Sequence, residues 1–453
     1  MKLLLKFILL LPVVSCSAQQ FIDNAKQEII FTTVNVIPMD TERVLLNQVV
    51  VVRNGRIAAI GDAGKTKYSK NAYLIDGKGK YLIPGLAEMH AHVPPVDDIE
   101  PMKEVLLLFA VNGVTTIRGM LGHPKHLELR TKIQSGEIFG PRFITSGPSF
   151  NGQSVKTAEA AAEMVRQQKT AGYDFLKLHP GLSKETFAAI AKTAKEVKIP
   201  FAGHVSFDVG VWRAIEAGYA TIDHLDGFIE SLVPETENTT EQQNGLFAMF
   251  IADKADTSKI SRLTTALRNN KIWVVPTQAL AERWFAPGKS PEALRSEPEM
   301  KYMPANTLNN WVNTKKNLMN NPQYNPEAIN RFIALRRKLI YACNKNGVGL
   351  LLGSDAPQVF DVPGFSLHHE LQYMVDAGLT PYEALKTGTV NVAGFLNKQD
   401  MGVIKTGAIA DLVLLNGNPL KDIKQVKNIE GVMLGTKWLD KDRIINELKK
   451  LEK

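Results

Sequence analysis

The sequence is poor in cysteine, with only Cys16 and Cys343 among its 453 residues. Two cysteines cannot form the disulfide framework of many small exported domains, and Cys16 is itself a candidate for lipidation. Basic residues form no stripe interleaved with aromatic side chains, although the formal net charge is +8. Redox chemistry and nucleic-acid binding are therefore both unexpected. Apolar residues are not depleted, at 44%, so the chain has room for one large domain and a smaller one.

Long hydrophobic runs are also missing, and no segment after the first 20 residues is apolar enough to span a membrane. Residues 7–14 form an apolar core that is itself too short for a stable span. The following Val13-Val-Ser-Cys16 is similar to a bacterial lipobox, in which Cys16 would be acylated. Cleavage after Ala18, which gives a soluble secreted protein, stays open as the alternative. We expect residues 1–18 to be a signal peptide with its lipobox. The exported chain would then be attached to the cell envelope only through the lipid on Cys16.

Short strands and tight turns dominate both ends of the chain. In residues 27–82, two β-branched runs flank Asn54-Gly55, the pair that favours a two-residue hairpin turn. The same pattern of short strands and tight turns occurs in residues 402–440, before a short amphipathic helix over 441–453. We therefore predict a small β-sandwich domain that is built from both termini.

The middle of the chain, residues 83–401, alternates apolar strands with helices, as a parallel α/β sheet requires. Eight strands in this length predict a (β/α)8 TIM-like barrel, and an open sheet is disfavoured because the Gly-rich phosphate turn after the first strand is missing. Residues 227–271 and 279–347 are too long for simple connections and are expected to cover one end of the barrel. The predicted strands are 82–90, 114–118, 143–146, 175–178, 201–204, 221–224, 273–276 and 349–354.

Polar side chains lie where these strands end, which an apolar core would not select. The first strand ends in His90-Ala-His92, and alternate residues of a strand point the same way, so both imidazoles can reach one cation. The other strand ends carry Lys177, His204, His224 and Asp355. Barrel enzymes collect their catalytic groups at this edge, and the six side chains suffice for two divalent cations.

On these motifs the chain resembles the amidohydrolase superfamily, in the binuclear-metal branch with imidazolonepropionase-like and prolidase-type proteins. The resemblance covers nearly all of the mature chain. It rests on Pro84-Gly-Leu-x-x-x-His90-x-His92, Phe175-Leu-Lys177, Ala202-Gly-His204, Ile222-Asp-His224 and Gly353-Ser-Asp355. Two departures are Glu88, where relatives more commonly have Asp, and Gly119, where many carry an acidic residue.

The resemblance implies a ligand set and a mechanism. His90, His92 and Asp355 would hold one metal ion, His204 and His224 the other, and a carbamate on Lys177 would bridge them. Zinc suits these ligands best, and Mn, Co, Ni or Fe could substitute. A hydroxide shared by the two metal ions would attack a C–N bond in a small molecule, with Asp355 as proton shuttle. The expected substrates are amides, cyclic amides or Xaa-Pro-type dipeptides.

Other assignments stay open. The same centre could serve a lactonase or phosphotriesterase, and a catalytically silent ligand-binding lipoprotein is the alternative from a different class. Arg118 is a candidate to grip a substrate carboxylate, or else pairs with a carboxylate of the barrel. His179 has the same strand parity as Lys177 and is a candidate substrate contact. The sequence indicates no oligomeric state.

Overall fold

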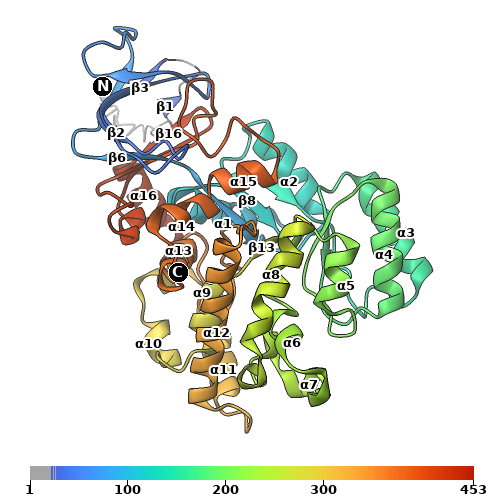
Figure 1. The fold of residues 1–453 in the computed structure, drawn as a ribbon. Coiled ribbons are helices and arrows are strands. Elements are labelled where there is room, and N and C mark those ends of the chain that lie inside the picture. The colour runs from blue at the N-terminus through green and yellow to red at the C-terminus, as the bar shows by residue number, and fades with distance from the viewer. Residues whose placement is uncertain (1–21, 24, 26) are drawn as a thin grey trace, which may run out of the picture.

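The computed structural model describes residues 22–23, 25 and 27–453. The proposed signal peptide and Cys16 lie outside these residues. Within the described part of the chain, no helix has the length and apolar character to cross a membrane. Figure 1 shows a sheet built near the N-terminus at one end of the molecule, and helices α6, α7 and α11 at the opposite end.

One nine-stranded sheet combines strands from both ends of the sequence. Its hydrogen-bonded order is β1-β16-β15-β14-β6-β2-β3-β4, with β5 added beside β2. The two ends join where β6 pairs antiparallel with β14, with Ile83 opposite Val413. The strands from the two ends of the chain therefore belong to one sheet, and the division of this sheet into the two layers of a sandwich stays a prediction. The bounds are β1 (Ile22–Asp23), β2 (Ile29–Val36), β3 (Leu45–Arg53), β4 (Arg56–Asp62), β5 (Tyr73–Asp76), β6 (Tyr81–Pro84), β14 (Leu412–Leu415), β15 (Ile429–Leu434) and β16 (Lys437–Asp440).

Local sequence explains the ends of this sheet. Asn54 and Gly55 both have positive φ, 50° and 71°, and connect β3 to β4 as the hairpin pattern predicts. Phe31, Leu82, Leu412 and Trp438 are buried in a common apolar cluster, so residues from both ends share a core. The Asp440 side chain accepts a hydrogen bond from the Arg443 amide at 2.8 Å, which caps α16 (Lys441–Leu451) directly after β16.

Seven parallel strands alternate with helices in the middle of the chain. They form a three-stranded sheet, β7 (Leu86–Ala91), β8 (Val114–Gly119) and β9 (Arg142–Thr145), and a four-stranded sheet, β10 (Leu176–Leu178), β11 (Phe201–Gly203), β12 (Thr221–Asp223) and β13 (Trp273–Val275). A parallel bridge between Ser146 and Phe175 joins the two sheets. The α/β class expected from the sequence is confirmed.

The predicted eighth strand, residues 349–354, is not a regular strand. Only Leu350 forms a bridge, to Val274 next to it in β13. The segment nevertheless lies against β7, because Met89 N donates to Leu352 O at 2.8 Å and Asp355 N donates to His90 O at 3.0 Å. Hydrogen bonds thus run from β7 through β13 and back to β7, an order consistent with a TIM-like barrel.

The helices follow the strands with sequence signals at their ends. The Thr157 and Ser183 side chains cap α3 and α4, and Gly172 ends α3 at φ 89°. The two long insertions carry α6 to α8 and α10 to α12. The bounds are α1 (Glu100–Val111), α2 (Lys125–Gln134), α3 (Ala158–Ala171), α4 (Lys184–Val197), α5 (Gly210–Ala217), α6 (Phe228–Leu232), α7 (Glu241–Asn244), α8 (Ile260–Asn269), α9 (Gln278–Leu280), α10 (Pro291–Arg295), α11 (Ala305–Met319), α12 (Pro326–Lys345), α13 (Phe365–Asp376), α14 (Pro381–Thr387) and α15 (Val390–Phe395).

Candidate metal centre

The end of β7 and the segment beside it bring His90, His92 and Asp355 together. His92 Nε2 lies 2.7 Å from Asp355 Oδ1, and His90 Nε2 lies 3.3 Å from the same oxygen. One ligand atom of each residue lies within 4.8 Å of those of the other two. Their relative position is fixed by the main chain, because His92 N also donates to Ala356 O at 2.8 Å.

The donor atoms of His90, His92 and Asp355 are better placed to coordinate a metal ion than to form hydrogen bonds with one another. His92 Nε2 and Asp355 Oδ1 are buried, and neither has a hydrogen-bond partner with acceptable angles among the described residues. Two buried polar atoms that face each other without a hydrogen bond are costly unless a third group joins them. Imidazole nitrogen and carboxylate oxygen are ligands that divalent transition metals accept. The residues therefore fit a divalent cation.

His204 and His224 form the second part of the centre, after β11 and β12. Their rings are stacked with centroids 4.3 Å apart, and His224 lies edge-on to His90 at 4.4 Å. His204 Nδ1 lies 2.7 Å from Asp226 Oδ2, and His224 Nδ1 lies 2.9 Å from Thr277 Oγ1. These contacts orient both rings, and they leave the buried His224 Nε2 without a partner in the described chain.

Lys177 extends from β10 between the two groups of histidines. Its side chain is fully buried, and its Nζ lies 3.4 Å from His90 Nε2. Burial lowers the pKa of Lys177 to about 8, because the charged ammonium loses solvent. The structure thus brings all six predicted ligands to one edge of the parallel strands.

Burial also sets the protonation state of the histidines. It lowers the pKa of His204 to about 3, and it holds the pKa of His90 and of His224 well below the usual value. Repulsion from Lys177 acts in the same direction on all three. These imidazoles are therefore neutral near pH 7, which is the form that binds metal ions.

Asp223 was not assigned a role from the sequence, although it belongs to the Ile222-Asp-His224 motif. Its Oδ2 lies 2.8 Å from His90 Nδ1, on the side of the ring away from Asp355. A signal was available, because Thr221 and Asp223 alternate along β12 and so point to the same side. The Thr221 hydroxyl donates to Asp223 Oδ1 at 2.6 Å.

Glu88 joins the two backbone segments that carry His90 and Asp355. Its carboxyl group accepts hydrogen bonds from His90 N at 2.9 Å, from Ser354 N at 2.9 Å and from Ser354 Oγ at 2.5 Å. Burial is the main cause that raises the pKa of Glu88 to about 8. The longer side chain, noted as a departure from relatives, therefore has a clear structural partner in Ser354.

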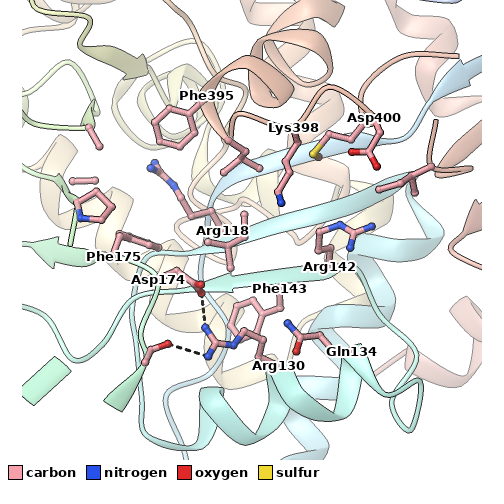
Figure 2. Close-up of a pocket in the computed structure, with 18 residues that line it drawn as sticks. Arg118, Arg130, Gln134, Arg142, Phe143, Asp174, Phe175, Phe395, Lys398 and Asp400 are labelled. Carbon is pink, nitrogen blue, oxygen red and sulfur yellow. Dashed lines mark hydrogen bonds and ion pairs between the residues drawn. The ribbon is translucent and has the colours of Figure 1, made fainter. Parts of the chain in front are cut away.

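Arg118 does not reach the edge where these ligands meet. It is 2% exposed, and its guanidinium donates to Met89 O at 2.7 Å and to Thr221 Oγ1 at 3.1 Å, with Asp223 Oδ2 at 3.4 Å. The structure therefore supports the alternative that Arg118 pairs with a carboxylate of the sheet. Figure 2 shows it beside Phe175 and Phe395 in a separate cavity of about 830 Å³, on the side where β11 and β12 begin.

A cavity of about 530 Å³ opens onto the candidate metal centre. His92, His204 and Asp355 line its floor, and residues of the long insertions line its walls. His179 lines it too, with its ring stacked on His204 at 5.0 Å, and its contact with substrate stays a prediction. Sequence reasoning missed Phe247, whose ring stacks on His224 at 5.2 Å and whose φ of 53° is unusual for a bulky residue.

The amidohydrolase family model matches residues 81–439 of this chain. The chain belongs to the amidohydrolase family. It is 23% identical to ochratoxinase of Aspergillus niger over 445 residues, which covers 89% of this chain and 84% of the relative. It is 24% identical to imidazolonepropionase of Idiomarina loihiensis over 376 residues, with 81% and 85% covered.

A solved structure of bottromycin amidohydrolase shares the fold. The TM-score is 0.70 at 20% sequence identity, and the match covers 93% of this chain and 89% of that one. The family model confirms the superfamily resemblance drawn from the sequence motifs, and the solved structure supports the fold.

Proposed function

We propose that this protein is a metal-dependent hydrolase that cleaves a C–N bond in an amide, a cyclic amide or a small dipeptide. The observation that carries the proposal is the convergence of four imidazoles, Lys177 and Asp355 beside one cavity, which three of these six residues line. The names of the two curated relatives, an ochratoxinase and an imidazolonepropionase, support a small-molecule substrate. The proposal includes a (β/α)8 barrel over residues 83–401, with a smaller β domain from 27–82 and 402–440.

Two divalent cations, with zinc the best match to the donors, would supply activation of water and polarisation of the scissile carbonyl. His90, His92 and Asp355 would hold one, and His204 and His224 the other. Lys177 would bridge them after its neutral amine adds to carbon dioxide and releases a proton, which leaves a carbamate with two oxygen ligands. The lowered pKa of Lys177 favours this reaction, because only the unprotonated amine is a nucleophile.

The protein's own side chains would orient the metal ligands and transfer the proton of the attacking water. Asp355 lies at the junction of the ligand groups and faces the cavity, so it can accept a proton from the attacking water and pass it to the leaving nitrogen. The hydrogen bonds of Asp226 and Thr277 would hold the imidazoles of His204 and His224 in the ligating orientation, and the Asp223 carboxylate lies 2.8 Å from His90 Nδ1.

The location of the protein is a further part of the proposal. The first 18 residues would direct export, and acylation of Cys16 would anchor the chain to the cell envelope. Labelling of growing cells with an alkyne-bearing fatty acid tests this step. We expect label on the wild-type protein and none on Cys16→Ser, whereas equal labelling of both would contradict lipidation at Cys16.

The proposed reaction is tested by turnover of the zinc-loaded protein on dipeptides, N-acyl amino acids, cyclic amides, lactones and phosphotriesters. We expect C–N bonds to be cleaved best and the activity to disappear with a chelator. Cleavage of lactones or phosphotriesters alone would replace the proposal with the alternative hydrolase. A loaded protein that turns over none of these classes would support a ligand-binding role.

A further inference from the structure

The cavity above the candidate metal centre has an unbalanced charge. Among the described residues that line it, none is a lysine or an arginine, whereas four are carboxylates: Asp226, Glu230, Glu241 and Asp355. Asp226 is paired with His204, and Asp355 belongs to the candidate ligand set. Glu230 and Glu241, both in the first long insertion, form no ion pair within residues 27–453.

The wall of the cavity also presents polar atoms that the protein itself does not use. Asn244 is only 2% exposed, and both its Nδ2 and its Oδ1 have no hydrogen-bond partner among the described residues. Glu230 Oε2 and Trp284 Nε1 are likewise buried without a partner in the described chain. A buried polar atom that forms no hydrogen bond is unfavourable, so these groups are available to hydrogen-bond a molecule that enters the cavity.

Aromatic rings complete this wall. Phe247 and Trp284 line the cavity beside Leu280. The backbone holds Phe247 over the centre in the left-handed region, at φ 53°, and the following Ala248 has φ 60°. Phe247 already contacts the Arg336 guanidinium, 5.7 Å from its ring centroid, so it supplies apolar surface, and the Trp284 ring can attract a cation.

Ionisation of the Glu230 carboxyl group is unfavourable in its buried position, and a cationic ligand would offset this cost. Burial, together with the nearby carboxylates Asp226 and Glu241, raises the pKa of Glu230 to about 7. A positive group beside Glu230 would favour its ionised form and form a charge-assisted hydrogen bond with it. Apart from the cations proposed at the metal centre, a substrate carboxylate would meet like charge on this wall, and the candidate cation for it, Arg118, lies in a different cavity.

We propose that this cavity selects substrates in which a cationic group, an ammonium, amidinium or guanidinium, lies next to an apolar group. Glu230 is the anionic partner, Asn244 hydrogen-bonds the adjoining polar part, and Phe247 and Trp284 cover the apolar part. The inference rests on the proposed function only in placing the scissile bond at the metal centre. Binding of the cation itself does not depend on turnover.

The test uses three ligands of nearly equal shape and different charge: benzamidinium, benzamide and benzoate. Their binding is measured by calorimetry at pH 7.5, on metal-free and on zinc-loaded protein. We expect benzamidinium to bind at least about tenfold more tightly than benzamide to both forms. Glu230→Gln should remove this preference and leave benzamide binding unchanged.

Two variants control the measurement. Glu235→Gln changes an exposed carboxylate in the same insertion that does not line the cavity, and it should bind all three ligands as the wild type does. Glu241→Gln changes the second unpaired carboxylate and should weaken benzamidinium by a smaller factor than Glu230→Gln. If Glu230→Gln does not fold, an undiminished preference in Glu241→Gln overturns the proposal.

Equal binding of benzamidinium and benzamide, or an unchanged preference in Glu230→Gln, would overturn the proposal. So would benzoate binding as the tightest ligand of the metal-free protein. If benzamidinium binds through Glu230 and no C–N bond is cleaved, the cationic subsite stands and the proposed reaction fails. If amides are cleaved and benzamidinium shows no preference, the reaction stands and the subsite fails.

Discussion

At the scale of single residues, the position of Asp355 gives it two tasks. One of its oxygens lies within 3.3 Å of both His90 Nε2 and His92 Nε2, and the side chain also faces the cavity. Its backbone φ of 71° is uncommon for a non-glycine residue, and its N donates to His90 O in β7 at 3.0 Å. An aspartate held in this way can contribute a ligand oxygen and exchange a proton with substrate.

Asp355→Asn keeps an oxygen ligand and removes the group that accepts a proton. We expect kcat to fall by a factor of about 10²–10⁴, the usual contribution of general acid–base catalysis, while metal content stays close to that of the wild type. Steady-state kinetics and elemental analysis of the same preparation measure both. A near-normal rate would remove Asp355 from the proton transfer.

Lys177→Ala removes the proposed bridge between the two groups of ligands. We expect metal content to fall to one equivalent or less, and short carboxylic acids with bicarbonate to restore part of it. Lys177→Glu, which supplies carboxylate oxygens, should retain more metal than the alanine variant. Full occupancy of Lys177→Ala, measured by elemental analysis, would defeat the carbamate.

The neutral histidines predict how the metal-free protein responds to acid. The folded-state pKa of His204 is about 3, below its ordinary value of 6.5, so between these pH values the unfolded state binds more protons than the folded state. Stability contributed by His204 is therefore present above pH 6.5 and is lost as the pH falls toward 3. Urea unfolding at several pH values measures this. Between pH 6.5 and 3, the free energy of unfolding should fall less steeply with decreasing pH in His204→Asn than in the wild type, and identical slopes would contradict this.

At the scale of structural elements, close packing of neighbouring strands creates the space for Lys177. Gly203 in β11 has φ 120°, and a Cβ at this position would lie 2.8 Å from Lys177 Cδ and 2.5 Å from Leu178 O. A glycine is therefore needed where β11 passes the lysine of β10. The Ala-Gly-His204 motif thus has a packing reason in addition to its histidine.

Gly203→Ala tests this reason against Gly172→Ala as a control. Both glycines have positive φ, but a Cβ at Gly172 meets no atom within 4 Å. Backbone strain should lower the free energy of unfolding by about 1–3 kcal/mol in both variants. Only Gly203→Ala should also lose metal, as elemental analysis will show; equal metal content in the two variants would contradict a role for Gly203 in positioning Lys177.

Sequence patterns predicted the strands and their ends well, because hydrophobic runs and the polar residues that follow them are local features. The pairing of Arg118 with Asp223 was beyond such patterns, since their contact depends on which strands face one another across the sheets. Residues 349–354 were predicted as a regular strand because an apolar run indicates burial, but it does not indicate which backbone groups form hydrogen bonds. The wall formed by Glu230, Asn244 and Phe247 lies in an insertion without periodicity, where no sequence rule places side chains.

At the scale of the whole molecule, the candidate ligands come from five different places in the chain, between His90 and Asp355. A cation that joins them binds only the folded protein and stabilises it by mass action. We expect zinc to raise the Tm of the metal-free protein in a concentration-dependent manner. His204→Ala should reduce this shift, and an unchanged Tm in the presence of zinc would argue against the site.

Metal content per chain tests the central claim most directly. It is measured on protein that begins at residue 22 and is purified without chelator, with His204→Ala beside it. The account predicts two equivalents of a divalent transition metal in the wild type and fewer in the variant. One equivalent in both would contradict the binuclear centre, and no metal after reconstitution with zinc would contradict the proposed catalytic mechanism as a whole.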